Sequence, residues 1–134
     1  MSRYAIQTTV PGTMDDVKAR VVAALKANGF GVLTEIDMQR ALHDKIGVDI
    51  EPYLILGACN PQAAYQALSV DREIGLLLPC NVMLRGADGQ VEVSILDPEA
   101  MFSLVDPTTQ QALATVPADM KQRLQQVLRD IQQA

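Results

Sequence analysis

Hydrophobic and polar residues alternate along residues 3–10, and this two-residue period predicts a half-buried β-strand. After a Pro-Gly break, apolar residues recur at the helical spacing from Met14 onward. Thr13 precedes this segment as an N-cap, and Gly29 follows it in the position where helices commonly end. The first part of the chain therefore predicts one strand followed by a long amphipathic helix.

The middle of the chain predicts two further strands, each followed by a helix. Residues 30–36 predict a strand, and Asp37 caps a short helix that ends at Gly47. Residues 53–59 are apolar at both odd and even positions, which is typical of a strand covered on both faces. Asn60, followed by proline, then begins another helix. We expect the buried stripe of this helix to contain Ala64, Tyr65 and Leu68.

The last part of the chain predicts a β-hairpin and a terminal helix. Residues 76–84 predict a strand, although Pro79 within it indicates an edge position or a bulge. Residues 90–96 follow a glycine-containing turn and predict its antiparallel partner. Two short helical segments then precede an amphipathic helix that begins at Pro117.

The predicted order of elements is β-α-β-α-β-α-β-β-α. A hairpin beside several short helices, rather than a regular alternation of strand and helix, favours the α+β class over a doubly wound α/β fold. No linker-like composition interrupts the pattern. We therefore predict a single α+β domain over residues 1–134.

Composition and charge exclude some classes of binding partner for this protein. The 134 residues are 49% hydrophobic but only 4% aromatic, so the core must be aliphatic, and the formal net charge is −5. The basic residues are scattered and outnumbered, which excludes the basic surface that nucleic-acid binding requires. The N-terminus lacks a signal-peptide profile, and the apolar runs are too short to span a bilayer. We predict a cytoplasmic protein with no nucleic-acid or membrane partner, whose two cysteines are free thiols.

Cys59 is the residue that the sequence most clearly marks as a candidate for chemical reactivity. It directly precedes the predicted N-cap Asn60, so its sulfur would lie near the positive end of a helix dipole. That environment lowers the pKa of a thiol and would make Cys59 a reactive or metal-binding thiolate. The alternative is a small buried residue at the end of a core strand, since free cysteine is often buried.

Cys80 and Asn81 repeat the same dipeptide on a later strand. Cys80 shares its strand parity with Leu78 and Val82, which favours burial, although a bulge at Pro79 could redirect it. The chain has no CxxC motif. With two cysteines and one histidine, the chain could form a closed four-ligand zinc site only across a symmetric dimer or with carboxylate ligands.

An acidic group surrounds Lys45, and it is either the polar wall of a pocket or solvated loop charge. Its members are Glu35, Asp37, Asp44, Asp49 and Glu51. His43, the only histidine, lies off the apolar stripe of its short helix, which favours a surface position over a catalytic base. No GxSxG or glycine-rich phosphate loop is present.

Several strings in the chain resemble the bacterial and archaeal family called the domain of unknown function 302 family. The matching strings are Val32–Asp37, Lys45–Gly47, Tyr53–Pro61, Ile74–Val82 and Asp97–Met101. The resemblance implies a curved antiparallel sheet with helices packed on one face, and it implies a homodimer. Both Cys-Asn dipeptides, Glu35 and Lys45 lie within these strings. The family has no established activity, so the resemblance implies no mechanism.

The sequence leaves three functions open. We favour a homodimeric ligand-binding or thiol- or metal-sensing protein centred on Cys59. Its ligand would be a small molecule or a soft metal such as Cu(I), which thiolates bind well. The predicted ligand-binding residues are Cys59, Asn60, Cys80, Asn81, Glu35 and Lys45. The alternatives are a structural or interaction module with packing cysteines and an enzyme with Cys59 as nucleophile, which would need a base and an oxyanion site.

Overall fold

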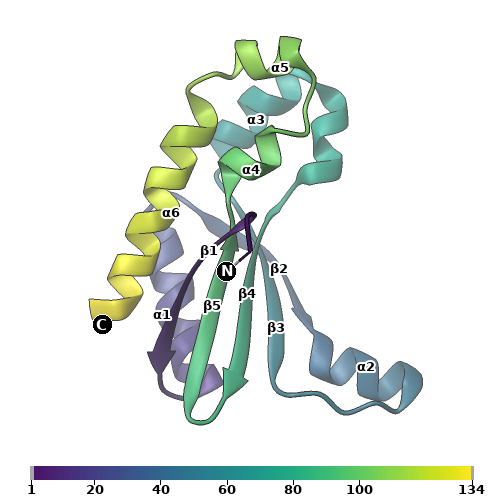
Figure 1. The fold of residues 1–134 in the computed structure, drawn as a ribbon, viewed down its shortest axis with the longest axis vertical. Helices are drawn as coiled ribbons and strands as arrows, with labels where there is room; N and C mark the ends of the chain where they lie inside the picture. The colour runs from purple at the N-terminus through teal and green to yellow at the C-terminus, as the bar shows by residue number, and fades with distance from the viewer. Residues whose placement is uncertain (1, 134) are drawn as a thin grey trace.

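A five-stranded antiparallel sheet organises residues 2–133, the part of the chain that the computed structural model describes. The strands lie in the order β1-β5-β4-β3-β2 (Figure 1). They are β1 (Ala5–Pro11), β2 (Gly31–Asp37), β3 (Tyr53–Cys59), β4 (Cys80–Ala87) and β5 (Gln90–Leu96). The helices are α1 (Met14–Ala27), α2 (Met38–Ile46), α3 (Pro61–Val70), the 3₁₀ helix η1 (Arg72–Leu77), α4 (Pro98–Phe102), α5 (Pro107–Ala112) and α6 (Val116–Gln133). The α+β class and the curved antiparallel sheet are confirmed.

Side-chain caps begin three of the helices where the sequence predicts them. Thr13, Asp37 and Asn60 each accept a hydrogen bond from the backbone N–H three residues further on, at 3.2, 2.9 and 2.9 Å. Gly29 and Gly47 follow α1 and α2 with positive φ angles of 89° and 68°, a conformation that glycine adopts without a steric penalty. Local chemistry therefore sets the boundaries of these elements.

Helices α1 and α6 cover one face of the sheet and form the main core with it. Alternate residues of the β4–β5 hairpin are fully buried in this core: Val82, Leu84, Val93 and Ile95. The helices contribute Val17, Val21, Leu25, Leu124, Val127 and Ile131. Each such side chain stabilises the fold by about 1.5–3 kcal/mol when it is removed from water.

A second, smaller core lies in a helical lobe beyond one end of the sheet. The lobe contains α3, η1, α4 and α5, and the N-terminal part of α6 closes it (Figure 1). Its buried residues are Ala67, Ile74, Met101, Phe102, Leu113 and Val116. Because α6 packs against both cores, it joins the lobe to the sheet.

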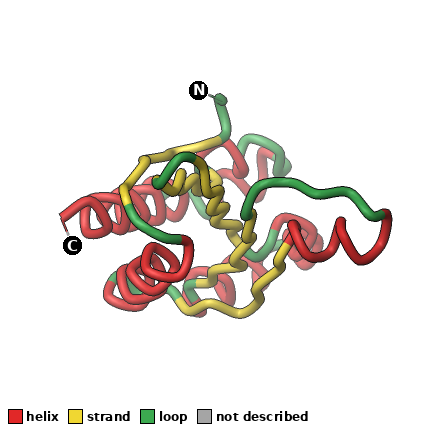
Figure 2. The backbone as a smooth tube through the Cα atoms, turned by 90° about the horizontal axis from the view of Figure 1, so that it is seen from below, coloured by secondary structure: helices red, strands yellow, loops and turns green. Residues whose placement is uncertain are grey.

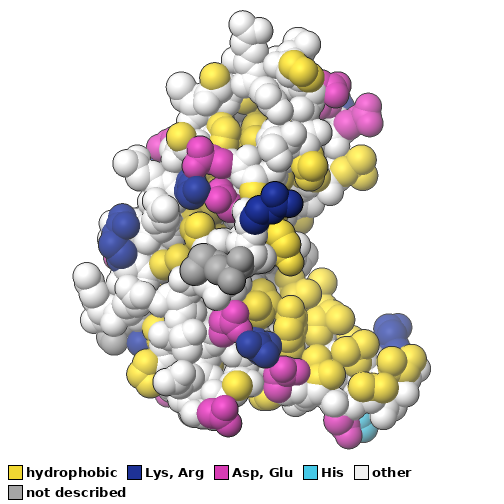
Figure 3. All heavy atoms as spheres, viewed as in Figure 1, with side chains coloured by type: hydrophobic (Ala, Val, Ile, Leu, Met, Phe, Trp, Pro, Cys, Tyr) yellow, Lys and Arg dark blue, Asp and Glu magenta, His cyan; other side chains and the backbone are white. Residues whose placement is uncertain are grey.

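The other face of the sheet is open, and α2 extends away from it (Figure 2). No residue of α2 is fully buried, although the helix carries the apolar stripe that the sequence predicts. Leu33, Ile36, Ile46 and Val48 are exposed on β2, α2 and the loop that follows. Figure 3 shows hydrophobic side chains gathered over α2 and the neighbouring part of the sheet, on the hollow side of the molecule.

The strand predicted over residues 76–84 starts too early, and the edge position that Pro79 suggested is wrong. Residues 72–77 form η1, and β4 begins only at Cys80 and runs through the middle of the sheet. Proline has no N–H to donate to a sheet, so Pro79 lies just before the strand rather than within it. Cys80 is consequently the first residue of β4, not a mid-strand residue.

Two expectations about burial also need correction. Tyr65 is 76% exposed, and the buried side of α3 is formed instead by Ala67, with Ala63 and Leu68 partly buried beside it. Strand β3 is not covered on both faces, because Ile55 points to the open face and remains partly exposed. In both cases an apolar side chain lies where this chain offers nothing to pack against it.

Candidate functional site

An apolar cavity of about 60 Å³ lies between the end of the sheet and the helical lobe. Phe30, Ala58 and Leu124 line it from the main core. Ile74 and Phe102 line it from the core of the lobe. The cavity therefore lies at the junction of the two cores, where two independently packed groups of side chains meet.

Cys59 and Cys80 both line this cavity. Cys80 pairs with Ala58 across β3 and β4, and Cys59 is the next residue along β3. Side chains alternate between the two faces of a sheet, so Cys80 lies on the helix-covered face with Ala58, and Cys59 approaches the cavity from the strand end. The structure thus brings the two predicted cysteines to one cavity.

Burial raises the pKa of the Cys59 thiol. This is opposite to the predicted effect of the helix dipole. Desolvation disfavours the charged thiolate, and it is the cause of this shift. Cys59 is therefore protonated at neutral pH.

Burial affects the thiol pKa of Cys80 more strongly than that of Cys59. Burial raises the pKa of its thiol to about 12. The thiol donates a hydrogen bond to the carbonyl oxygen of Leu96, with a distance of 3.6 Å between sulfur and oxygen. A protonated thiol with a carbonyl acceptor has the character of a packing residue rather than that of a nucleophile.

Asn60 connects the cavity to the end of α1. Its side-chain oxygen caps α3, and its side-chain nitrogen donates a hydrogen bond to the carbonyl oxygen of Gly29 at 3.1 Å. The amide is thereby held in one orientation at the edge of the cavity. Among the six predicted site residues, Asn60 joins the two cysteines at this cavity.

The other three predicted site residues lie elsewhere. Asn81 is exposed on the open face, in a shallow hollow that also contains Met83 and Ser94. Glu35 forms an ion pair with Lys18 of α1, with 2.6 Å between the charged atoms. Lys45 is exposed near the end of α2. The acidic group around Lys45 is therefore not the wall of the cavity.

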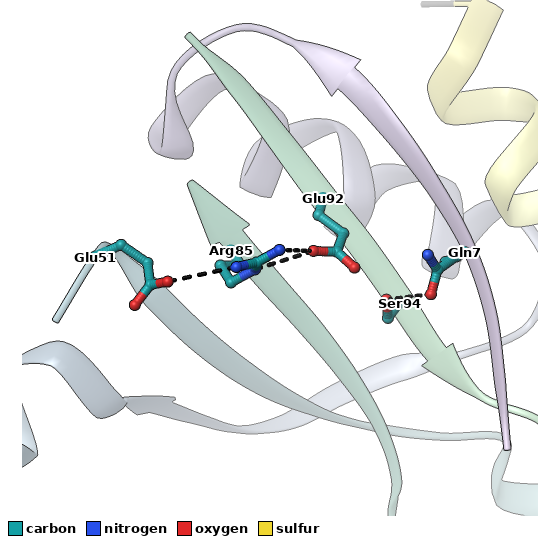
Figure 4. Close-up of polar contacts among 5 residues, drawn as sticks. All are labelled: Gln7, Glu51, Arg85, Glu92 and Ser94. Atoms are coloured by element: carbon teal, nitrogen blue, oxygen red, sulfur yellow. Dashed lines mark hydrogen bonds and ion pairs between the residues drawn. The ribbon is translucent and has the colours of Figure 1, made fainter. Parts of the chain in front are cut away.

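The open face carries a row of polar contacts that the sequence analysis missed (Figure 4). Arg85 donates to Glu92 at 2.6 Å and to Glu51 at 3.5 Å. Ser94 donates to Gln7 at 3.4 Å on the neighbouring strands. Arg85 and Glu92 are paired across β4 and β5, so the predicted hairpin could have indicated that they lie close together. Glu51 could not have been found this way, because it comes from a distant loop.

Arg123 of α6 is a further residue that the sequence does not reveal. A Cβ atom added to Gly29 would lie 3.1 Å from a terminal guanidinium nitrogen of Arg123 and 3.2 Å from the amide nitrogen of Asn60. The two polar groups therefore flank the same small notch above Gly29. No local pattern indicates this proximity, because the fold brings together three distant segments.

Within residues 2–133, no group of three or more His, Cys, Asp or Glu side chains is placed to hold a metal ion. In that same range, no helix is long and apolar enough to cross a membrane.

Comparisons with known proteins give the family of the chain. No curated protein sequence matches it. The crystal structure of an uncharacterized conserved protein, DUF302, from Bacillus stearothermophilus is similar, with a TM-score of 0.83 and 27% sequence identity. That similarity covers 97% of this chain and 99% of the other. The profile of the family described as "Domain of unknown function DUF302" matches residues 6–131. The chain therefore belongs to the DUF302 family.

Proposed function

We propose that this protein is a homodimeric binding protein that takes a small apolar ligand, or the apolar part of a larger one, into the cavity lined by Cys59 and Cys80. The observation that carries the proposal is the cavity itself, which lies between the two hydrophobic cores. Protein interiors contain few voids larger than a water molecule, so a space of this kind needs an explanation.

The chemistry of the lining favours a hydrocarbon group as the occupant. Apart from Asn60 and the two thiols, the cavity is lined by aliphatic and aromatic side chains. A water molecule needs about two to four polar partners, which such a wall does not supply. Apolar cavities of this type stay dry and accept apolar ligands.

The two thiols support binding rather than catalysis or metal sensing. Both have raised pKa values, so neither is a thiolate at neutral pH. A cysteine nucleophile and a Cu(I) ligand both act as the thiolate, so a raised pKa disfavours both functions. As neutral groups, Cys59 and Cys80 are soft, weakly polar parts of an apolar wall.

A second copy of the chain is the proposed partner on the open face. Strand β2 is an edge strand whose residues are almost all exposed, with Leu33 at 65% and Ile36 at 47% exposure. Ile46 of α2 continues this apolar surface at 67% exposure. A two-fold symmetric pairing covers the same patch on both copies and removes a free sheet edge, which is otherwise a site of aggregation.

The binding proposal is tested by titrating 1-butanol into the protein and recording NMR chemical shifts. We expect saturable changes at residues lining the cavity. Ala64→Leu places a larger side chain at a half-buried lining position and should abolish these changes. Ala19→Leu, at an exposed position of α1, is the control and should bind like wild type.

Two results would count against this function. Shift changes that are absent from the cavity, or that persist unchanged in Ala64→Leu, would leave Cys59 and Cys80 as packing residues of an interaction module.

A further inference from the structure

The cavity is closed within the lobe and lined by partly exposed residues at its rim. Ala67, Ile74 and Phe102, which line it within the lobe, are buried. Asn60 and Met120, which line it from the first turn of α3 and from α6, remain partly exposed. Leu78, directly after η1, lines the cavity and is partly exposed as well, but Asn60 is the only amide among the described lining residues. We therefore assign the polar end of a ligand to the side between the start of α3 and α6.

Two polar groups lie at this side of the cavity, Asn60 in its lining and Arg123 beside it. Arg123 follows Met120 by one turn of α6, and its guanidinium lies beside Asn60 across the notch above Gly29. Gly29 has a φ of 89°, a conformation that other residues rarely adopt, so the notch stays without a side chain. Phe30, the next residue, lines the cavity, which makes the notch and the cavity neighbours.

Both groups have hydrogen-bonding capacity for a ligand. One N–H of the Asn60 amide donates to Gly29, and the described part of the chain supplies no acceptor for the other. Arg123 uses its Nε in a long contact of 3.5 Å with Asp119, and both side chains are about half exposed. Such an exposed ion pair is weak, and it leaves the terminal guanidinium nitrogens of Arg123 for a second carboxylate.

The size of the cavity limits the apolar part of the ligand. An engineered cavity of about 150 Å³ accepts benzene. At about 60 Å³, the present cavity holds a hydrocarbon group smaller than a benzene ring. The ligand is thus a short chain with a polar end rather than a long lipid.

From these observations, and resting on the binding function proposed above, we propose that the ligand is a short-chain aliphatic carboxylate. Its hydrocarbon part fills the cavity beside Cys59 and Cys80. Its carboxylate accepts hydrogen bonds from the guanidinium of Arg123 and the amide of Asn60 at this side of the cavity. Arginine suits this role because its planar donors match the two oxygens of a carboxylate.

The test compares sodium butyrate with 1-butanol, a neutral molecule of similar size, at matched ionic strength and by NMR titration. Wild type should bind butyrate about tenfold more tightly or better, since a hydrogen bond to a charged group contributes roughly 1.5–3 kcal/mol. Arg123→Gln should remove this preference, because it weakens butyrate binding, which uses a charge-assisted hydrogen bond, far more than butanol binding. Arg129→Gln, an exposed arginine of the same helix that bonds to Gln126, is the matched control and should keep the preference.

The outcomes separate this inference from the binding function on which it rests. Equal affinity of wild type for butyrate and butanol would overturn the carboxylate ligand while the apolar binding function stands. A preference for butyrate that survives in Arg123→Gln would also overturn it. Binding of neither compound would overturn both.

Discussion

Gly57 and Pro79 are in close contact at the end of the sheet, where β3 passes the residue before β4. A Cβ atom on Gly57 would lie 2.7 Å from Cγ of Pro79, and it would also collide with the hydroxyl oxygen of Thr34. The proline ring therefore occupies the space that a side chain at position 57 would need. This contact fixes the path of the chain directly before Cys80, and so it positions one wall of the cavity.

Gly57→Ala should destabilise the fold by about 1–3 kcal/mol, the usual cost of overpacking a closely packed site. The Thr34 hydroxyl can rotate away, but the Pro79 ring is rigid, so the backbone must shift. Urea denaturation measures the change. Gly31→Ala in β2 is the control, because nothing lies within 4 Å of its added Cβ. Equal stability of the two variants would show that the end of the sheet adapts freely.

Cys80 should make the protein less stable at alkaline pH. The thiol has a pKa of about 12 in the folded protein and an ordinary value of about 8.5 in the unfolded chain. Between these values the unfolded chain releases a proton that the folded protein retains. The free energy of unfolding therefore falls as pH rises, by up to about 1.4 kcal/mol per pH unit from this thiol.

Denaturation of wild type and Cys80→Ala between pH 8 and 11 checks this expectation. Both proteins share every other titrating group, so only the difference between their pH profiles is informative. We expect the wild-type curve to fall more steeply above the ordinary thiol pKa. Parallel curves would mean that Cys80 ionises as easily in the folded protein as in the unfolded chain.

Thiol labelling distinguishes a neutral Cys59 from an activated one. Since burial raises its pKa, Cys59 should react with a disulfide reagent at pH 7.5 more slowly than free cysteine does. Cys80, with a pKa of about 12, should react far more slowly still. Cys80→Ser and Cys59→Ser isolate the two rates. If Cys59 were labelled faster than free cysteine, the result would contradict a raised pKa and support the thiolate that its position before a helix predicts.

The proposed dimer depends on the apolar surface of β2 and α2. Ile46→Glu should weaken self-association by about tenfold or more, because a charge buried in an apolar interface carries a large desolvation cost. Sedimentation equilibrium measures the effect. Leu104→Glu is the control, since Leu104 lies in the loop after α4 and is similarly exposed, at 72%. A monomeric wild type, or equal weakening by both substitutions, would contradict the proposed interface.

The sequence by itself determined the elements whose signals are local. Thr13 and Asp37 cap helices through hydrogen bonds to residues three positions away, and Gly29 terminates α1 because it tolerates a positive φ. The alternation of apolar residues in β5 likewise predicts Val91 and Val93 as core. These features depend on short-range hydrogen bonding, backbone sterics and periodicity, which can be read from neighbouring residues.

Only the tertiary structure decided which residues share a site. It separated Glu35, Lys45 and Asn81 from the cavity, because ion pairs and strand faces depend on the packing of distant segments. It also raised the pKa of Cys59, since burial is a property of the whole fold and here opposes the local helix dipole. For the same reason, no pattern along the chain could place Arg123 and Asn60 around Gly29: that proximity exists only after α1, α3 and α6 have packed together.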